Sequence, residues 1–75
     1  MADLSTPADL EKLGARLKEL RMAKGYTNYE QFAYDHNIPR AQYGRYERGQ
    51  DLRISSLLKV LRALEVSPSE FFKGF

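Results

Sequence analysis

The three residues Asn37-Ile38-Pro39 restrict the fold of this chain more than any other stretch of its sequence. Asn37 is one of the few types of non-glycine residue that tolerate the left-handed backbone in which a helix often ends. Pro39 disfavours helical geometry at Ile38 and suits the first turn of a following helix. Because only about three residues separate the helices expected over about 29–36 and about 39–48, the sequence predicts that they cross at a large angle.

The helix expected over about 29–36 starts at Asn28, where the sequence favours a capping box. The Asn28 side chain can accept a hydrogen bond from the Gln31 N–H, and the Gln31 side chain can reach back to the Asn28 N–H. Phe32 and Ala33 then point inward. A small residue at position 33 indicates that another helix crosses closely there.

Apolar spacing predicts two longer helices. The first covers about 8–24, with Thr6 as its cap, Pro7 at its first position and Gly25 just after its end. A later helix covers about 54–65 and carries the strongest apolar stripe of the chain. That stripe consists of Ile54, Leu57, Leu58, Leu61 and Leu64.

A fifth helix is expected over about 68–73, because Ser67 and Glu70 have the spacing of a capping box. No stretch alternates in the manner of a strand. A chain of 75 residues supports one small core. We therefore predict an all-α protein with a flexible tail over 1–7 and one domain over 8–75.

The composition excludes several kinds of site. The chain has no cysteine and one histidine, so neither a disulfide nor a metal centre is expected, and no motif indicates a cofactor. No apolar run approaches the roughly 20 residues needed to cross a bilayer. The first residues lack the basic and apolar segments of a signal peptide, so the cytoplasm is the expected location.

Positive charge is concentrated in the middle of the chain. The net charge is only +2, but the stretch from His36 to Arg53 holds four arginines against Glu47 and Asp51. This distribution is compatible with a polyanion as partner. A solvated helix face is the alternative explanation.

The helix expected over about 39–48 carries Tyr43 and Tyr46 three residues apart, and this spacing favours burial in the core. The alternative is a stacking platform for single-stranded nucleic acid. Tyr34, in the preceding helix, is expected to cover that helix.

Four motifs in order resemble the phage repressor and Cro type (XRE-like) helix-turn-helix family. They are L-K-E-L-R before Gly25, F-A followed by Asn37-Ile38, Y-E-R-G ending at Gly49, and S-S-L-L-K-V-L-R-A-L-E-V-S-P-S-E-F-F. The resemblance covers about 10–73. It implies a compact five-helix bundle, a lambda-repressor-like DNA-binding domain whose helix-turn-helix is formed by the second and third helices.

In this family the third helix, here about 39–48, reads the major groove of double-stranded DNA. Arginine can bind guanine, and glutamine can bind adenine, through paired hydrogen bonds. The positions that match base contacts are Arg40, Ala41, Gln42, Gly44 and Arg45. Gly44 would let the backbone approach the DNA closely. The positions expected to meet phosphates are Asn28, Tyr29, Arg48 and Arg53.

The resemblance also implies an ion pair between Arg21 and Glu47 that holds the third helix against the first. Three residues depart from the family pattern. Tyr29 replaces the usual glutamine, Asn37 replaces the usual glycine of the turn, and Arg53 replaces the usual serine or threonine cap. The family commonly pairs through its last helix. The expected dimer surface therefore consists of Phe71, Phe72 and Phe75.

The expected function is sequence-specific binding of double-stranded DNA by a transcriptional regulator. We expect a small homodimeric repressor of bacterial or phage origin on a near-palindromic operator, with no small-molecule ligand and no membrane. An enzyme is not expected, because no nucleophile, metal set or phosphate loop accompanies Glu30, Asp35 and Glu70. Two alternatives stay open: an antitoxin-like or restriction-controller repressor, and a protein-interaction module that kept the fold and lost DNA binding.

Overall fold

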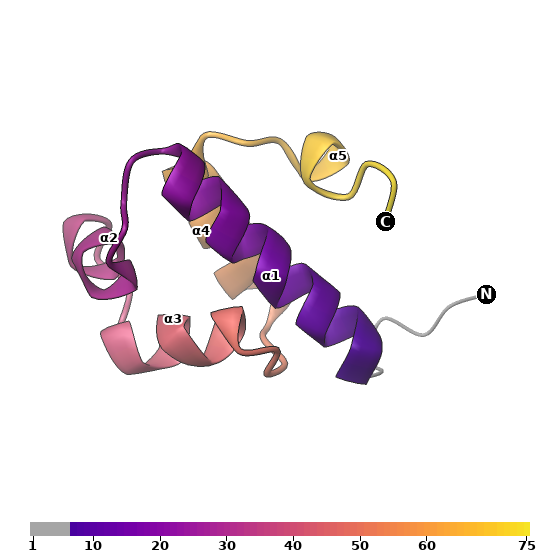
Figure 1. The fold of residues 1–75 in the computed structure, drawn as a ribbon, viewed down its shortest axis with the longest axis horizontal. Helices are drawn as coiled ribbons and strands as arrows, with labels where there is room; N and C mark the ends of the chain where they lie inside the picture. Colours follow the sequence, from indigo (N-terminus) through magenta and orange to yellow (C-terminus); the bar gives the residue numbers. More distant parts are fainter. Residues whose placement is uncertain (1–6) are drawn as a thin grey trace.

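Five helices make up residues 7–75, the part of the chain that the computed structural model describes, and this part contains no strand (Figure 1). The all-α prediction is confirmed, and each helix lies within two residues of its expected bounds. The expected cap Thr6 lies outside the described residues. The helices are α1 (Pro7–Ala23), α2 (Tyr29–Asp35), α3 (Arg40–Glu47), α4 (Ile54–Leu64) and α5 (Pro68–Phe71).

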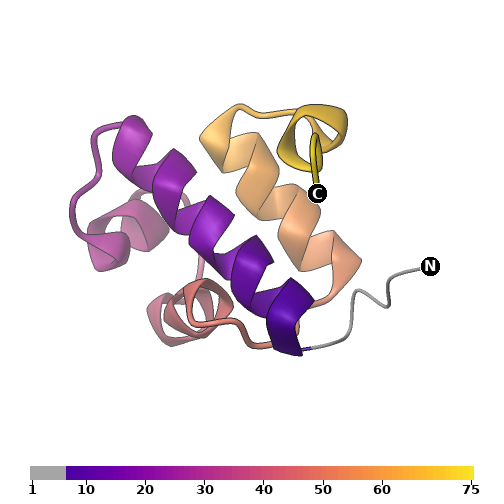
Figure 2. The same ribbon diagram turned by 45° about the vertical axis from the view of Figure 1, so that its right-hand side comes forward.

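The longest helix, α1, occupies the middle of the structure. In Figure 2 it lies between the α2–α3 pair on one side and α4 on the other. α3 packs against both α1 and α2, while α5 packs against α4. α1 and α2 therefore hold α3 at one edge of the molecule, and α4 and α5 close the opposite side.

The core lies where these helices meet. Its largest fully buried side chains are Tyr43, Phe32, Phe71, Leu17, Leu61 and Val60. Removing such apolar surface from water is the main force that holds a small domain together. Ala33 is fully buried where α2 meets α3, as its small size indicated.

Two apolar residues that were expected to cover the core are exposed. Ile54 is 70% exposed because the first turn of α4 projects past the core, and Leu57 is the first buried residue of that helix. Tyr34 is 73% exposed because it follows Phe32 and Ala33 directly and so lies on the outer face of α2. The buried stripe of α4 includes Val60, which is 1% exposed. It does not include the exposed Ile54 or the half-buried Leu58.

The turn between α2 and α3 is closed by the backbone. Asn37 has a φ of +57°, and the Ile38 N–H donates to the Ala33 carbonyl oxygen at 2.8 Å. This is the hydrogen bond of a Schellman ending, in which a left-handed residue stops a helix. Ile38 is buried and anchors the turn in the core. The prediction that Asn37 would adopt the left-handed backbone is confirmed.

Capping differs in one respect from the prediction. The Asn28 oxygen accepts from the N–H groups of Glu30 at 2.7 Å and Gln31 at 3.3 Å. The Gln31 side chain does not return to Asn28, because it donates along the helix to Asp35 at 2.8 Å. At α5, Ser67 likewise accepts from the Glu70 N–H. Only the first half of each capping box therefore forms within the described residues.

Candidate nucleic-acid interface

α3 has one buried side and one exposed side. Tyr43 is fully buried and Tyr46 is 8% exposed, so these two rings fix the helix to the core. The prediction that both tyrosines belong to the core is confirmed, and the alternative of a stacking platform is ruled out for Tyr43. Four of the residues that match base contacts in the family lie on the exposed side, namely Arg40, Ala41, Gln42 and Arg45.

Gly44, the fifth of these residues, is buried and faces Tyr29 of α2. A Cβ atom at this position would lie 2.8 Å from the Tyr29 Cε1 atom and 3.0 Å from its hydroxyl oxygen. Such a contact is too close for any real side chain. The structure thus gives Gly44 a packing role: it makes room for the Tyr29 ring between α2 and α3, where backbone approach to DNA had been expected.

Arg21 and Glu47 are brought together at the crossing of α1 and α3. The Arg21 Nε and Nη2 atoms donate to the two carboxylate oxygens of Glu47, each at 2.9 Å. The Nη1 atom donates to the Tyr26 carbonyl oxygen at 2.8 Å. Both side chains are at least nine-tenths buried, and the hydrogen bond with Glu47 raises the pKa of Arg21. The pair therefore holds the end of α3 on α1 while it neutralises the carboxylate of Glu47.

The Tyr43 hydroxyl lies beside this ion pair. It is buried and has no hydrogen-bond partner in the described part of the chain. Burial, followed by the neighbouring Glu47 carboxylate, raises the pKa of Tyr43 far above its ordinary value. Tyr43 therefore stays uncharged and acts as a core residue.

The arginines of this region remain free to meet an anion. Arg40, Arg45, Arg48 and Arg53 are all exposed, and none has an ion-pair partner within residues 7–75. Because Glu47 is paired with Arg21, its charge does not offset them. The exposed side of α3 and the loop after it thus carry a net positive charge.

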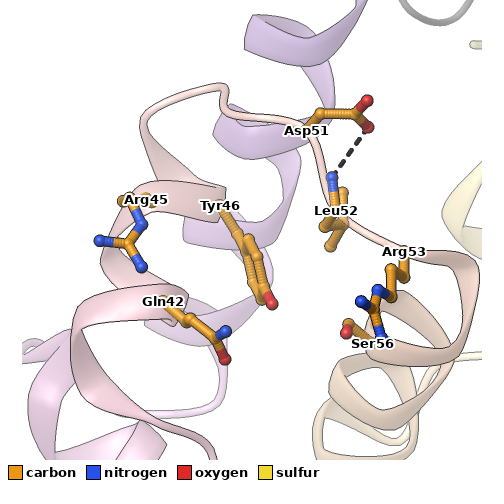
Figure 3. Close-up of a pocket in the computed structure, with 7 residues that line it drawn as sticks. All are labelled: Gln42, Arg45, Tyr46, Asp51, Leu52, Arg53 and Ser56. Atoms are coloured by element: carbon orange, nitrogen blue, oxygen red, sulfur yellow. Dashed lines mark hydrogen bonds between the residues drawn. The ribbon is translucent and has the colours of Figure 1, made fainter.

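A shallow hollow lies between α3 and the start of α4 (Figure 3). Gln42 and Tyr46 on one side face Arg53 and Ser56 on the other. The carboxylate of Asp51 is at the rim, where it accepts from the Leu52 N–H at 2.8 Å. Guanidinium, amide and hydroxyl groups therefore dominate the hollow, which is lined by Gln42, Arg45, Tyr46, Asp51, Leu52, Arg53 and Ser56.

The two residues expected to meet phosphates at the start of α2 differ from each other in exposure. Asn28 is exposed, and its side-chain oxygen caps α2, so only its amide N–H groups can serve an external acceptor. Tyr29 is half-buried, with its ring centre 6.3 Å from that of Tyr43 and its hydroxyl beside Gly44.

The carboxylates that could suggest acid–base chemistry are not gathered into a site. Asp35 accepts from the Tyr26 hydroxyl and from Gln31, each at 2.8 Å, whereas Glu30 and Glu70 are exposed on different helices. No group of three metal-ligating side chains occurs among residues 7–75. None of the helices described for this chain is long and apolar enough to cross a bilayer.

A family model described as helix-turn-helix matches residues 17–71, which extend from the middle of α1 to the end of α5. That is well over half of the chain. The chain belongs to this helix-turn-helix family. The protein is accordingly a DNA-binding transcriptional regulator, as its sequence predicted.

Two solved structures are similar over nearly the whole chain. The restriction-modification controller protein C.AhdI from Aeromonas hydrophila is 41% identical, with a TM-score of 0.77, over 87% of this chain and 98% of that one. A mutant of the restriction-modification controller protein C.Esp1396I is 38% identical, with a TM-score of 0.75, over 85% of each chain. No curated protein matches this chain.

In this helix-turn-helix regulator the aromatic residues near the end of the chain are not one exposed patch. Phe71 is 1% exposed and belongs to the core, so it does not form the expected dimer surface. Phe72 and Phe75 are half-buried. The Lys12 ammonium and the Arg16 guanidinium lie over the Phe75 ring, 4.9 and 5.3 Å from its centre.

Two residues that shape the site, one in the core and one on the surface, were missed from the sequence. Gly14 lets α3 approach α1, and its only signal was a glycine inside a strongly helical pattern. Ser56 lines the hollow opposite Gln42, and nothing in the spacing of α4 marked it. Both depend on how helices distant in sequence come together.

Proposed function

We propose that this regulator is a homodimeric repressor that binds a near-palindromic operator, with α3 in the major groove. One observation carries the proposal: Arg40, Gln42 and Arg45 project from the exposed side of α3, while Glu47 is turned inward and paired. A helix with guanidinium and amide groups on its free side can reach base edges. Ala41 offers an apolar contact to a thymine methyl group.

Phosphate contacts on either side of α3 would hold it in register. Arg48 and Arg53 follow the helix and are exposed without ion-pair partners in the described chain. Asn28 caps α2 and Tyr29 is its first residue, and their amide and hydroxyl groups are suitable donors. We assign no base contact to Gly44, because Tyr29 covers it.

The cellular role we propose is control of a restriction-modification system in the cytoplasm of a bacterium. The similarity to two restriction-modification controller proteins supports it. A gene for a restriction endonuclease beside this one would agree with the proposal. A toxin gene in that place would instead indicate an antitoxin-like repressor.

The test of base reading is selection of bound sequences from a random duplex pool. Arg40→Ala and Arg45→Ala should each relax the selected sequence at one base pair per half-site, with a loss of about 1–3 kcal/mol there. Arg62→Ala is the matched control, because Arg62 is exposed in the last turn of α4, at the other end of that helix from Arg53. Equal weakening on all sequences would assign the arginine to phosphate. Failure of the wild type to bind any duplex would favour a protein-interaction module.

A further inference from the structure

Tyr46 is a core residue whose polar end is left without a partner. Its side chain is only 8% exposed. No hydrogen bond to its hydroxyl group occurs within the described chain. Because this hydroxyl is not among the buried polar atoms that lack a partner, solvent reaches it. Figure 3 shows this hydroxyl directed into the hollow between α3 and α4.

The opposite wall of the hollow is the start of α4. Arg53 precedes this helix and makes no side-chain cap, so the first N–H groups of α4 have no capping side chain. Such an uncapped start attracts anions, because its free N–H groups are hydrogen-bond donors and the helix dipole gives this end a partial positive charge. Ser56, in the first turn, adds a hydroxyl group to this wall.

The charges around the hollow favour an anion over a cation. Arg45 and Arg53 line it and are exposed. Asp51 is the one carboxylate among the lining residues, and it is turned to the Leu52 N–H at the rim. An anion in the hollow would therefore meet the Arg53 guanidinium, the Tyr46 hydroxyl and the uncapped helix start, with Arg45 at the outer edge beyond Tyr46.

We propose that Tyr46 binds a DNA phosphate, with its hydroxyl donating to a phosphodiester oxygen seated in this hollow. The inference rests on the proposed function and deepens it, because it assigns a neutral phosphate donor to a residue that otherwise packs in the core. Burial of the ring holds the donor in place before DNA arrives, so little side-chain entropy is lost on binding.

The test uses Tyr46→Phe, which keeps the buried ring and removes only the hydroxyl. Affinity for duplex DNA should fall roughly five- to tenfold, the factor expected for one net hydrogen bond. The fall should be equal on operator and random duplex, because a phosphate carries no sequence information. The salt dependence should not change, since no charge is removed, whereas Arg53→Ala should reduce its slope by about one.

The matched control is Tyr43→Phe, which removes the buried hydroxyl of the other tyrosine of α3 and should leave DNA affinity unchanged. Thermal melting verifies that both variants fold. A duplex with a neutral methylphosphonate at each position in turn then locates the phosphate. A methylphosphonate at that phosphate should weaken DNA binding by the wild type more than it weakens DNA binding by Tyr46→Phe.

Three results would overturn the inference. They are equal affinity of Tyr46→Phe and the wild type, a loss confined to one base pair, and identical methylphosphonate profiles for the two proteins. In the wild type with labelled tyrosine, the Tyr46 Cζ resonance should also shift on DNA binding. Absence of duplex binding by the wild type is a separate outcome, which would overturn the proposed function as well.

Discussion

Arg21 fixes the position of α3 although it does not lie on the exposed side of that helix. Its guanidinium contacts Glu47 at the end of α3 and the Tyr26 carbonyl in the loop before α2. α1, α3 and that loop are therefore fixed by one planar group. The resemblance to the family implied the Arg21–Glu47 contact, but the bond to Tyr26 depends on the path of the loop and could not be predicted.

Glu47→Gln should cost about 3–5 kcal/mol of unfolding free energy, because it leaves the buried Arg21 charge uncompensated. Urea denaturation measures the loss. Glu30→Gln, at an exposed carboxylate on α2, is the control and should stay within about 0.5 kcal/mol of the wild type. A loss below about 1 kcal/mol for Glu47→Gln would mean that water reaches the pair in solution.

For single residues, the sequence predicted which side chains of α3 are exposed. It did not predict the structural role of every residue of α3. The free arginines and Gln42 follow from helical spacing once Tyr43 and Tyr46 are assigned to the core. The role of Gly44 does not follow from spacing, because the space for its Cβ atom is occupied by Tyr29 of another helix.

Between elements, the crossing of α1 and α3 is closer than the sequence indicated. A Cβ atom on Gly14 would lie 2.6 Å from the Tyr46 carbonyl oxygen and 2.7 Å from that of Glu47. These are backbone atoms of α3, so neither can move without shifting that helix. The absent side chain of Gly14 thus sets how deeply α3 sits against α1.

Gly14→Ala should destabilise the protein by about 1–3 kcal/mol net, since overpacking outweighs the gain of roughly 1 kcal/mol in helix propensity. Chemical denaturation checks the sign. Lys18→Ala, at an exposed position of the same helix, should change stability by less than about 0.5 kcal/mol. If Gly14→Ala proves more stable than the wild type, the two helices are not held at this distance in solution.

Helix ends were predicted well wherever a residue type marks them. Gly25, Asn37 and Gly49 all have positive φ at the expected ends of α1, α2 and α3. Glu65 has a φ of +59° after α4, which nothing in its residue type indicated. Its side chain pairs with Lys24 of the loop after α1, and this contact lowers the pKa of Glu65.

For the whole molecule, the end of the described chain is folded back on α1. The Arg16 Nη1 atom donates to the carbonyl oxygens of Phe71 at 2.7 Å and Lys73 at 3.0 Å. Lys12 donates to the carbonyl oxygen of Phe75 at 3.1 Å. The sequence showed an excess of aromatic residues here, but not that basic side chains of α1 cover one of them. Under the proposed dimer, Phe72 is therefore the aromatic residue that we expect to contact the second copy of the chain.

Phe72→Glu should lower the dimer fraction, because a charged group at a subunit contact must lose its hydration. Sedimentation at several concentrations measures the fraction. Met22→Glu is the control, since Met22 is 49% exposed at the other end of α1. An unchanged mass for Phe72→Glu would limit Phe72 to contacts within its own chain, such as its edge-to-face contact with Phe71.

The endings of the first four helices also bear on how fast the chain folds. Each closes with the same backbone hydrogen bond across five residues, from Tyr26 to Arg21, Ile38 to Ala33, Gln50 to Arg45 and Val66 to Leu61. Every stop signal is thus local and can form before distant parts of the chain meet. Helical proteins with mostly local contacts fold in microseconds to milliseconds, and we expect this regulator to fold in that time range.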